Sequence, residues 1–209
     1  MFRSAKREPA LDPEFLLIAY CSGYFPMASS RTGAIEWYSP DQRAIIPLDN
    51  FRISRSLRRV MRRGIFDVRI DTAFERVMRC CAERDDTWIS EEIITAYCAL
   101  HARGYAHSIE CWHDNLLAGG LYGVAIRGAF FGESMFSKKT DASKVALAHL
   151  VARLTAREYT LLDTQFMTEH LRTVGAVEIP RSAYIQQLSQ SLENLCTFVD
   201  DENSLSARQ

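Results

Sequence analysis

Two polar side chains, two residues apart, interrupt an apolar segment in the last quarter of the chain. The run Thr160-Leu161-Leu162-Asp163-Thr164-Gln165-Phe166-Met167 is typical of a strand, in which alternate side chains share a face. We therefore expect Asp163 and Gln165 to point the same way. Burying an unpaired carboxylate costs several kcal/mol, so such a group is usually paired, hydrogen-bonded or functional. Asp163 is either a structural acid satisfied by the backbone or by an arginine, or a group that handles protons.

A second acid lies in the segment Gly132-Glu133-Ser134-Met135-Phe136-Ser137. Strand alternation predicts that Glu133 and Met135 share one face while Ser134 and Phe136 take the other. Two carboxylates near one cleft could accept a cationic substrate and help to remove its proton. A pairing of Glu133 with a core arginine is the alternative, and the sequence leaves both open.

Positive charge is concentrated in the first third of the chain, although the formal net charge is only -1. Residues 1–63 contain 11 Lys and Arg against 6 Asp and Glu, whereas the remainder contains 14 against 20. A helix over the segment from Ile53 to Gly64 would place four arginines on one face: Arg55, Arg58, Arg59 and Arg62. Such a stripe could follow nucleic-acid phosphates. A solvated helix face is the plainer alternative.

Aromatic residues recur beside polar ones in Trp37-Tyr38, in Thr87-Trp88-Ile89, at Tyr97 and at Trp112. Unpaired bases stack on such rings for about 1–3 kcal/mol each, which would suit the single-stranded end of an RNA. For any single tryptophan, packing in the core is the more common role.

Metal and cofactor motifs are absent from the sequence. The six cysteines show no C-x-x-C spacing, so we expect reduced, mostly buried thiols. His101, His107 and His113 recur every six residues, which fits no metal motif. The glycines of Gly119–Gly123 lie in a strand pattern rather than at a strand-to-helix turn, so they make a poor phosphate cradle. We therefore expect neither a metal nor a cofactor.

The pattern also argues against a membrane or secreted protein. The longest charge-free run, from Phe15 to Ser30, is shorter than the ~20 apolar residues that span a bilayer, and it contains Gly23 and Pro26. The amino terminus shows no signal peptide. We expect a cytoplasmic protein.

Hydrophobic periodicity sets out the elements that would position these residues. Helical spacing recurs over 72–83, 91–103 and after Asp141, which we expect to cap its helix. Strand patterns cover 107–112, 116–126, 129–136 and 159–167, with Arg127-Gly128 as a tight turn. A short helix should start near Thr168.

This order predicts an α+β fold, a mixed and largely antiparallel sheet flanked by helices, similar to the acetyltransferase-like (GNAT-type) fold. The turn signal at Ser39-Pro40-Asp41 places a boundary between a small amino-terminal domain, residues 1–41, and a catalytic domain, residues 42–209. The glycine-rich pyrophosphate loop that coenzyme A would need before the main helix is missing, so the donor should be another molecule.

Ordered motifs give the chain a specific resemblance to the bacterial leucyl/phenylalanyl-tRNA protein transferase family. The matching segments cover about residues 11–184 and are Gly23-Tyr24-Phe25-Pro26, Trp37-Tyr38-Ser39-Pro40-Asp41, Ile53-Ser54-Arg55-Ser56, Thr87-Trp88-Ile89, residues 104–112, Gly119-Gly120-Leu121-Tyr122-Gly123-Val124-Ala125, Phe131-Gly132-Glu133-Ser134-Met135-Phe136-Ser137, Asp141-Ala142-Ser143-Lys144, Leu161-Leu162-Asp163-Thr164-Gln165 and residues 175–181. Each segment alone would be weak evidence, whereas their number and order make the resemblance specific.

The resemblance implies a small amino-terminal domain joined to an acetyltransferase-like domain that uses aminoacyl-tRNA in place of coenzyme A. It implies transfer of Leu or Phe, and less readily Met, to proteins that begin with Lys or Arg, which marks them for degradation by the N-degron route. No cofactor is implied, and we expect a monomer.

The resemblance also implies roles for individual residues. Asp163 and Gln165 would position and activate the attacking amine, and Glu133 would hold the substrate end of the tRNA or the acceptor. Trp88 and Tyr97 would contact the terminal adenosine, and Met27 stands where many relatives have a Trp. The pocket for the apolar side chain of the donor would comprise Leu121, Phe130, Met135, Leu147, Leu150, Leu154 and Leu162.

Two other classes fit parts of the pattern. A noncatalytic tRNA-binding module would need only the arginines and aromatics, and an acyltransferase could use coenzyme A despite the missing loop. An assay with Leu-tRNA and an acceptor peptide distinguishes the transferase from the binding module, because a binding module leaves the peptide unmodified.

Overall fold

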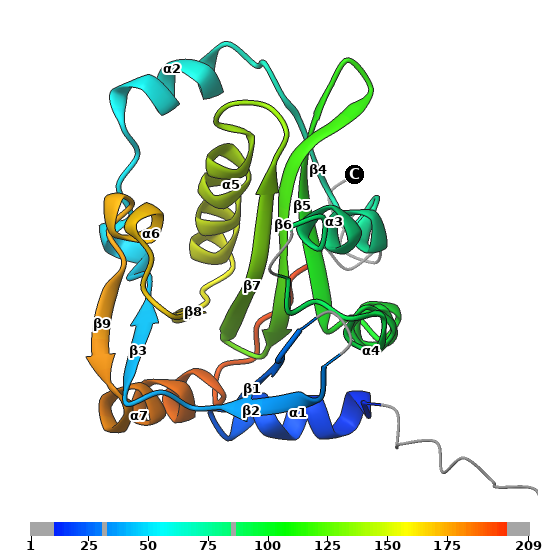
Figure 1. Ribbon diagram of the computed structural model, residues 1–209. Helices are drawn as coiled ribbons and strands as arrows, with labels where there is room; N and C mark the ends of the chain where they lie inside the picture. The colour runs from blue at the N-terminus through cyan, green and yellow to red at the C-terminus, as the bar shows by residue number, and fades with distance from the viewer. Residues whose placement is uncertain (1–10, 31–32, 85–86, 200–209) are drawn as a thin grey trace, which may run out of the picture.

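The computed structural model describes residues 11–30, 33–84 and 87–199. Helix α1 (Pro13–Cys21) comes first, followed by strands β1 (Phe25–Ala28) and β2 (Ile35–Tyr38), which form a small antiparallel sheet of their own. The carboxylate of Asp12 accepts the backbone N–H of Glu14, and Pro13 occupies the first turn, where its missing N–H costs nothing. These elements form the small amino-terminal region (Figure 1).

A seven-stranded sheet forms the body of the protein, in the order β4-β5-β6-β7-β8-β3-β9. Its strands are β3 (Gln42–Ile45), β4 (Asp67–Ile70), β5 (Ala106–His113), β6 (Leu116–Ile126), β7 (Ala129–Ser137), β8 (Leu161–Gln165) and β9 (Val177–Pro180). The pairing of β7 with β8 is parallel and the other pairings are antiparallel. The sheet is therefore mixed and largely antiparallel, which confirms the expected α+β class.

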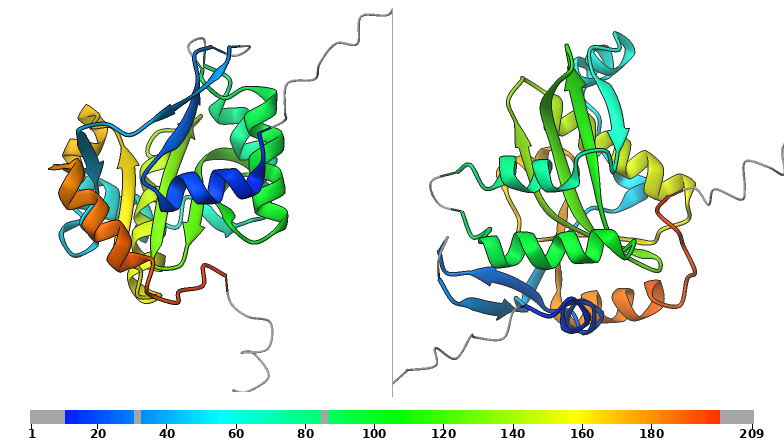
Figure 2. Two further views of the ribbon diagram at one scale, coloured as in Figure 1. Left: turned by 90° about the horizontal axis from the view of Figure 1, so that it is seen from below. Right: turned by 90° about the vertical axis from the view of Figure 1, so that its right-hand side faces the viewer.

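Helices cover both faces of this sheet (Figure 1). Helix α5 (Ala142–Ala156) packs on one face, and helices α3 (Phe74–Cys81) and α4 (Glu91–Ala102) pack on the other. The remaining helices are the 3-10 turn Leu48–Asn50, α2 (Arg55–Arg62), α6 (Glu169–Thr173) and α7 (Arg181–Ser191). Helix α1 lies across one end of the sheet between α4 and α7 (Figure 2).

Two apolar cores result from this layering. One lies on the α3 and α4 side and includes Leu16 and Tyr20 of α1, so the amino-terminal region packs directly on the main body. The other lies under α5 and includes Leu147 and Leu150. The division into domains at residue 41 stays a prediction.

The β6–β7 hairpin and the α5 crossover follow the sequence pattern closely. Strand β6 has the expected bounds, and Arg127, with a φ of 52°, turns the chain into β7 together with Gly128. The expectation that Asp141 caps α5 is wrong in its detail. Asp141 precedes the helix in a left-handed conformation, its side chain makes no capping hydrogen bond, and its carboxylate lies 3.4 Å from the Lys144 ammonium.

The six cysteines, all within the described residues, are unpaired thiols. Three of them are buried, Cys21 is exposed, and Cys98 and Cys196 are intermediate. Among the helices that the structure describes, none has the length and apolar character needed to span a bilayer.

Candidate active site

A pocket of about 420 Å³ lies where strands β7 and β8 separate. The two strands pair only from Ala129 to Phe131 and from Leu161 to Asp163, and the pocket is lined by the residues that follow on each strand. Its full lining is Phe25, Met27, Arg84, Trp88, Leu121, Tyr122, Gly132, Glu133, Ser134, Met135, Leu147, Leu150, Leu162, Thr164, Gln165, Phe166, Thr168, His170 and Leu171. The pocket thus draws on β1, both faces of the main sheet, α5 and α6.

One wall of the pocket is apolar. Leu121 comes from β6, Leu147 and Leu150 from α5, and Leu162 from β8, all of them nearly fully buried. Met135 adds an unbranched, partly exposed side chain from β7. A surface of this kind binds an apolar side chain by removing it from water, which stabilises the bound state by ~25 cal/mol for each Å² of apolar surface that is buried.

The pocket also contains an unusual carboxyl group, Glu133. Its Oε1 accepts hydrogen bonds from Tyr20 Oη at 2.7 Å and from Gln165 Nε2 at 3.4 Å, and its Oε2 lies 3.2 Å from Tyr97 Oη. The Tyr20 and Tyr97 hydroxyls also contact one another. Both phenols donate to the carboxyl group, so a hydrogen bond between the two phenols as well would require a proton on Glu133.

Burial also favours the protonated form of the Glu133 carboxyl group. Loss of water, followed by the negative charge of Asp163, raises the pKa of Glu133 to about 8, although the hydrogen bonds from Tyr20 and Tyr97 and the charge of Arg43 oppose the rise. Burial also raises the pKa of both tyrosines well above 10. The group therefore holds a proton near neutral pH.

A β-bulge sets the direction of Glu133. In the β6–β7 pairing, Tyr122 lies opposite Ser134 and Gly123 lies opposite Gly132, so Glu133 is the extra residue. Consequently Glu133 contacts tyrosines on the α4 side, whereas Met135 packs into the core under α5. The expectation that Glu133 and Met135 share a face was wrong, because the bulge resets the alternation.

Asp163 is fully buried and forms an ion pair with Arg43 of β3. Arg43 Nε donates to Oδ1 at 2.9 Å and Nη2 donates to Oδ2 at 2.6 Å. Tyr184 Oη also donates to Oδ2 at 2.9 Å. The rings of Phe25 and Tyr184 each lie 4.5 Å from the guanidinium carbon. Burial lowers the pKa of Arg43, but Asp163 more than offsets this and the net shift is upward.

The carboxylate of Asp163 does not line the pocket, whereas Gln165 does. The two residues are linked through the backbone, since the N–H of Gln165 donates to Asp163 Oδ1 at 2.9 Å. Gln165 has a φ of 59°, a left-handed conformation that ends the strand and accounts for β8 being shorter than expected. Of the two alternatives for Asp163, the structure shows the one in which an arginine pairs with the carboxylate. Asp163 can therefore influence the pocket only through Gln165.

Three further residues that were expected at the site also lie outside the pocket. Tyr97, Phe130 and Leu154 are fully buried and do not line the pocket. Tyr97 sits in the core beneath Glu133 and cannot stack on an adenine there. Phe130 packs against the ring of Phe198, with 5.3 Å between ring centroids. The sequence places apolar residues at these positions with strand or helix spacing, which correctly predicted that they are buried. The same pattern does not distinguish a residue that lines a cavity from one that packs in the core.

Trp88 lines the pocket together with Phe25 and Met27 of β1, and its expected contact with the terminal adenosine stays a prediction. Sequence reasoning gave no role to Arg43, Tyr20 or Tyr122. An arginine within the apolar strand pattern that contains Ala44 and Ile45 was a usable signal, because a charge in such a strand requires a partner.

The four arginines of α2, Arg55, Arg58, Arg59 and Arg62, are exposed, and Leu57 of the same helix is buried. The hydroxyl of Ser54 accepts the N–H of Leu57 and caps the helix. Arg55, Arg58 and Arg62 line a shallow hollow of about 500 Å³ with Ile53 and Met61.

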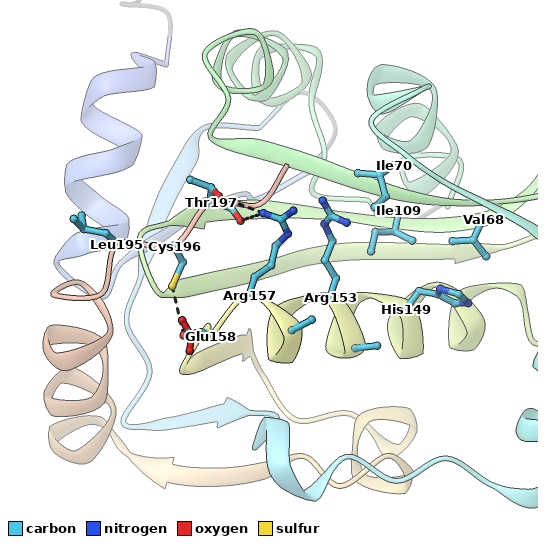
Figure 3. Close-up of a pocket in the computed structure, with 12 residues that line it drawn as sticks. Val68, Ile70, Ile109, His149, Arg153, Arg157, Glu158, Leu195, Cys196 and Thr197 are labelled. Carbon is cyan, nitrogen blue, oxygen red and sulfur yellow. Dashed lines mark hydrogen bonds between the residues drawn. The ribbon is translucent and has the colours of Figure 1, made fainter. Parts of the chain in front are cut away.

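Another hollow, of about 710 Å³, lies away from these groups, between helix α5 and strands β4 and β5 (Figure 3). Its arginines hold the carboxyl-terminal segment in place. Arg153 Nε donates to Phe198 O at 2.6 Å, and Arg157 Nη1 donates to the carbonyls of Thr197 and Val199 at 3.0 Å. We assign this hollow to that structural role.

Within the described part of the chain, no three His, Cys, Asp or Glu side chains come together as they would around a metal ion. The polar groups of the pocket are instead proton donors and acceptors.

The fold and the site together define an α+β protein whose mixed sheet opens between two parallel strands, where an apolar wall meets the Glu133 carboxyl group in one pocket. Comparison with known proteins specifies the family. Residues 45–189 match the sequence model of the leucyl/phenylalanyl-tRNA protein transferases, and residues 10–41 match that of their amino-terminal domain. The chain belongs to the leucyl/phenylalanyl-tRNA protein transferase family.

Individual relatives are similar over nearly the whole chain. A leucyl/phenylalanyl-tRNA–protein transferase of Herpetosiphon aurantiacus is 55% identical over 189 residues, covering 90% of this chain and 98% of the relative. One from Salinibacter ruber is 53% identical over 183 residues, covering 88% and 81%. Among solved structures, L-PGS from Bacillus licheniformis has a TM-score of 0.41 and 16% identity over 77% of this chain and 55% of its own. That last similarity is too weak to support an inference.

Proposed function

We propose that this protein transfers leucine or phenylalanine, and less readily methionine, from aminoacyl-tRNA to the amino terminus of proteins that begin with Lys or Arg. The product is a new peptide bond that marks the acceptor for degradation, and we place the enzyme in the cytoplasm as a monomer. The observation that carries the proposal is the junction of an apolar wall with Glu133 and Gln165 in one pocket. The names of the relatives support the same donor.

In this proposal the donor side chain lies against Leu121, Leu147, Leu150 and Leu162. Its ester then reaches the polar end of the pocket, next to Gln165 and Glu133. Trp88 and Met27 would contact the terminal adenosine from the amino-terminal side. Phe130 and Leu154 would support this wall from the packed core without touching the donor.

The donor ester is already activated, so the enzyme mainly holds the amine and the carbonyl carbon together, which alone can supply several kcal/mol. The amine nitrogen attacks the carbonyl carbon, the bond to the ribose oxygen breaks, and one amine proton must leave while the ribose oxygen gains one. An amino-terminal amine has a pKa of about 7.7–8.0. Glu133, with a pKa of about 8, matches it and can exchange the proton at little cost.

Gln165 steers the amine with its amide group, and Asp163 is a positioning residue that holds the Gln165 backbone. The hypothesis that Asp163 orients Gln165, and that the pair steers the amine, is thereby kept, with Gln165 as the residue that contacts the amine. No cofactor is required by this chemistry. The α2 arginines would bind tRNA phosphates at a distance from the pocket.

The test is a transfer assay with charged tRNAs carrying Leu, Phe, Met or Ala, and with peptides that differ only in their first residue. We expect the peptides that begin with Arg or Lys to gain one Leu or Phe residue, detected by mass. Unmodified peptide together with tight tRNA binding would indicate a binding module instead. Modification supported by an acyl-coenzyme A and not by aminoacyl-tRNA would indicate the coenzyme A alternative.

A further inference from the structure

Tyr122 of β6 has a buried hydroxyl group that the proposed mechanism does not use. The residue is fully buried, it lines the pocket, and its Oη has no hydrogen-bond partner among the described residues. Trp112 Nε1 and His170 Nε2 are also buried atoms without a hydrogen-bond partner among the described residues. Trp112, however, does not line the pocket, and His170 is only partly buried. Buried hydroxyls are almost always hydrogen-bonded, so a buried hydroxyl without a partner, on a residue that lines a pocket, requires an explanation.

The ring of Tyr122 is held firmly. It packs edge-on against Phe74 and Tyr97, with centroid distances of 5.9 and 6.0 Å. Its backbone lies opposite Ser134, directly before the register shift that produces the bulge at Glu133. The hydroxyl therefore has a fixed position, as a group that binds a reacting atom should.

The chemistry of the site indicates which atom this hydroxyl would meet. Burial, and after it the charge of Glu133, raises the pKa of Tyr122 well above 10, so the phenol keeps its proton and can donate it in a hydrogen bond. The preceding residue, Leu121, belongs to the apolar wall on the other face of the sheet. A donor whose side chain lies on that wall carries its ester carbonyl only a few atoms away, at the polar junction.

We propose that the Tyr122 hydroxyl donates a hydrogen bond to the oxygen of the donor ester on which negative charge develops. This inference rests on the proposed transfer of an aminoacyl group. As the amine nitrogen bonds to the carbonyl carbon, the C=O electron pair moves onto oxygen, and the phenol stabilises that oxyanion without losing its proton. When the bond to the ribose oxygen breaks, the pair returns and the C=O bond reforms.

The test compares Tyr122→Phe with the parent in steady-state transfer of Leu to a peptide that begins with Arg, alongside thermal unfolding. The variant keeps the ring and removes only the hydroxyl. We expect kcat to fall on the order of 100- to 1,000-fold, as for loss of an oxyanion donor, with KM for Leu-tRNA nearly unchanged. We expect Tm to stay equal or rise, because an unpartnered polar atom leaves the interior. Tyr159→Phe, a buried tyrosine outside the pocket, is the matched control with parental kinetics.

The outcomes are separable. A parental kcat in Tyr122→Phe, or a change in KM alone, overturns the role of the hydroxyl while leaving the transfer reaction in place. A drop in kcat that accompanies a drop in Tm also overturns it, because that result indicates a structural hydroxyl. Absence of transfer by the parent protein refutes the proposed function and this inference together.

Discussion

At the scale of single residues, the Arg43–Asp163 pair stabilises the strands that border the pocket. Arg43 is 1% exposed and Asp163 is 0% exposed, and each would be an uncompensated charge without the other. The pair also joins β3 to β8, where Ile45 lies opposite Asp163. Its integrity therefore decides whether Gln165 is held at the pocket.

We predict that Asp163→Asn lowers the free energy of unfolding by about 3–5 kcal/mol, because it leaves the Arg43 charge buried without a counter-ion. Urea unfolding measures this. Asp67→Asn is the control, since its 2.7 Å ion pair with Arg69 is exposed and should contribute less than about 1 kcal/mol. Equal stability losses in the two variants would show that burial does not set the strength of the Arg43–Asp163 pair.

A second prediction concerns Glu133 and pH. Its folded-state pKa is about 8, above the 4.5 of an ordinary glutamate, because burial disfavours the charged form. The folded state thus retains a proton that the unfolded state loses, so the contribution of this group to stability falls as pH rises from 4.5 to 8. Glu133→Gln should remove that loss.

The measurement is the unfolding free energy of both proteins from pH 5 to pH 9. Relative to the parent, we expect the unfolding free energy of Glu133→Gln to rise by about 1–3 kcal/mol between the two ends of this range. One unit of pKa shift corresponds to ~1.4 kcal/mol, and the full value is reduced because the side chain is partly exposed to solvent. A constant difference between the proteins at all pH values would mean that Glu133 titrates normally.

The sequence identified the residue types of the site better than their partners. Glu133 and Gln165 were predicted and do line the pocket, because polar residues in apolar strands mark unusual positions. The partners of Asp163 and Glu133 come from strands and helices far away in sequence, such as Arg43 and Tyr20. Local periodicity carries no information about such pairings.

At the scale of elements, the bulge in β7 places Glu133. Gly123 makes it possible, because a Cβ there would lie 2.3 Å from Phe131 O and 2.5 Å from the Phe130 ring. A glycine inside a strand is a known sign of a bulge or of close packing. Gly123 was therefore a sequence signal for the β-bulge at Glu133, which a prediction based only on strand alternation did not include.

Substitution of that glycine gives a third prediction. Gly123→Ala should lower the free energy of unfolding by about 1–3 kcal/mol, because the backbone must shift to admit the methyl group. Its register partner provides the control, since a Cβ on Gly132 would meet only Asp163 O at 3.4 Å. Thermal unfolding of both variants checks this. If Gly132→Ala were the less stable variant, the packing argument would be wrong.

Helix α2 gives a fourth prediction. We expect Arg58→Gln to weaken binding of aminoacyl-tRNA and to reduce the slope of log K against log salt by about 1, as loss of one phosphate contact does. Arg103→Gln is the control, because Arg103 directly follows α4 and pairs with Glu14 of α1 at 3.5 Å. Both of these helices lie at the end of the molecule opposite α2 (Figure 1). A filter-binding titration at several salt concentrations measures both. An unchanged slope in Arg58→Gln would favour a merely solvated helix face.

At the scale of the whole molecule, the fold class followed from the order of strand and helix patterns. The β6–β7 hairpin and α5 were predicted because each is long and strongly periodic, whereas the five-residue strand β8 was predicted from the apolar residues that flank Asp163. The place of β3 between β8 and β9 was not, since a strand of four residues leaves little periodicity to detect. The pocket depends on this arrangement, because β3 carries the arginine that holds β8.

The central claim is that the side chain of the donor amino acid binds in the pocket between β7 and β8. The most direct measurement is kcat/KM for Leu-tRNA and for Phe-tRNA in the parent and in Met135→Phe, which narrows the pocket from its partly exposed side. Leu195→Phe, in the separate hollow behind α5, is the control. We predict that Met135→Phe reduces use of the larger Phe donor about 10-fold more than use of Leu, as pocket size effects on apolar groups commonly do. Equal effects on both donors, or none, would contradict the assignment of this pocket.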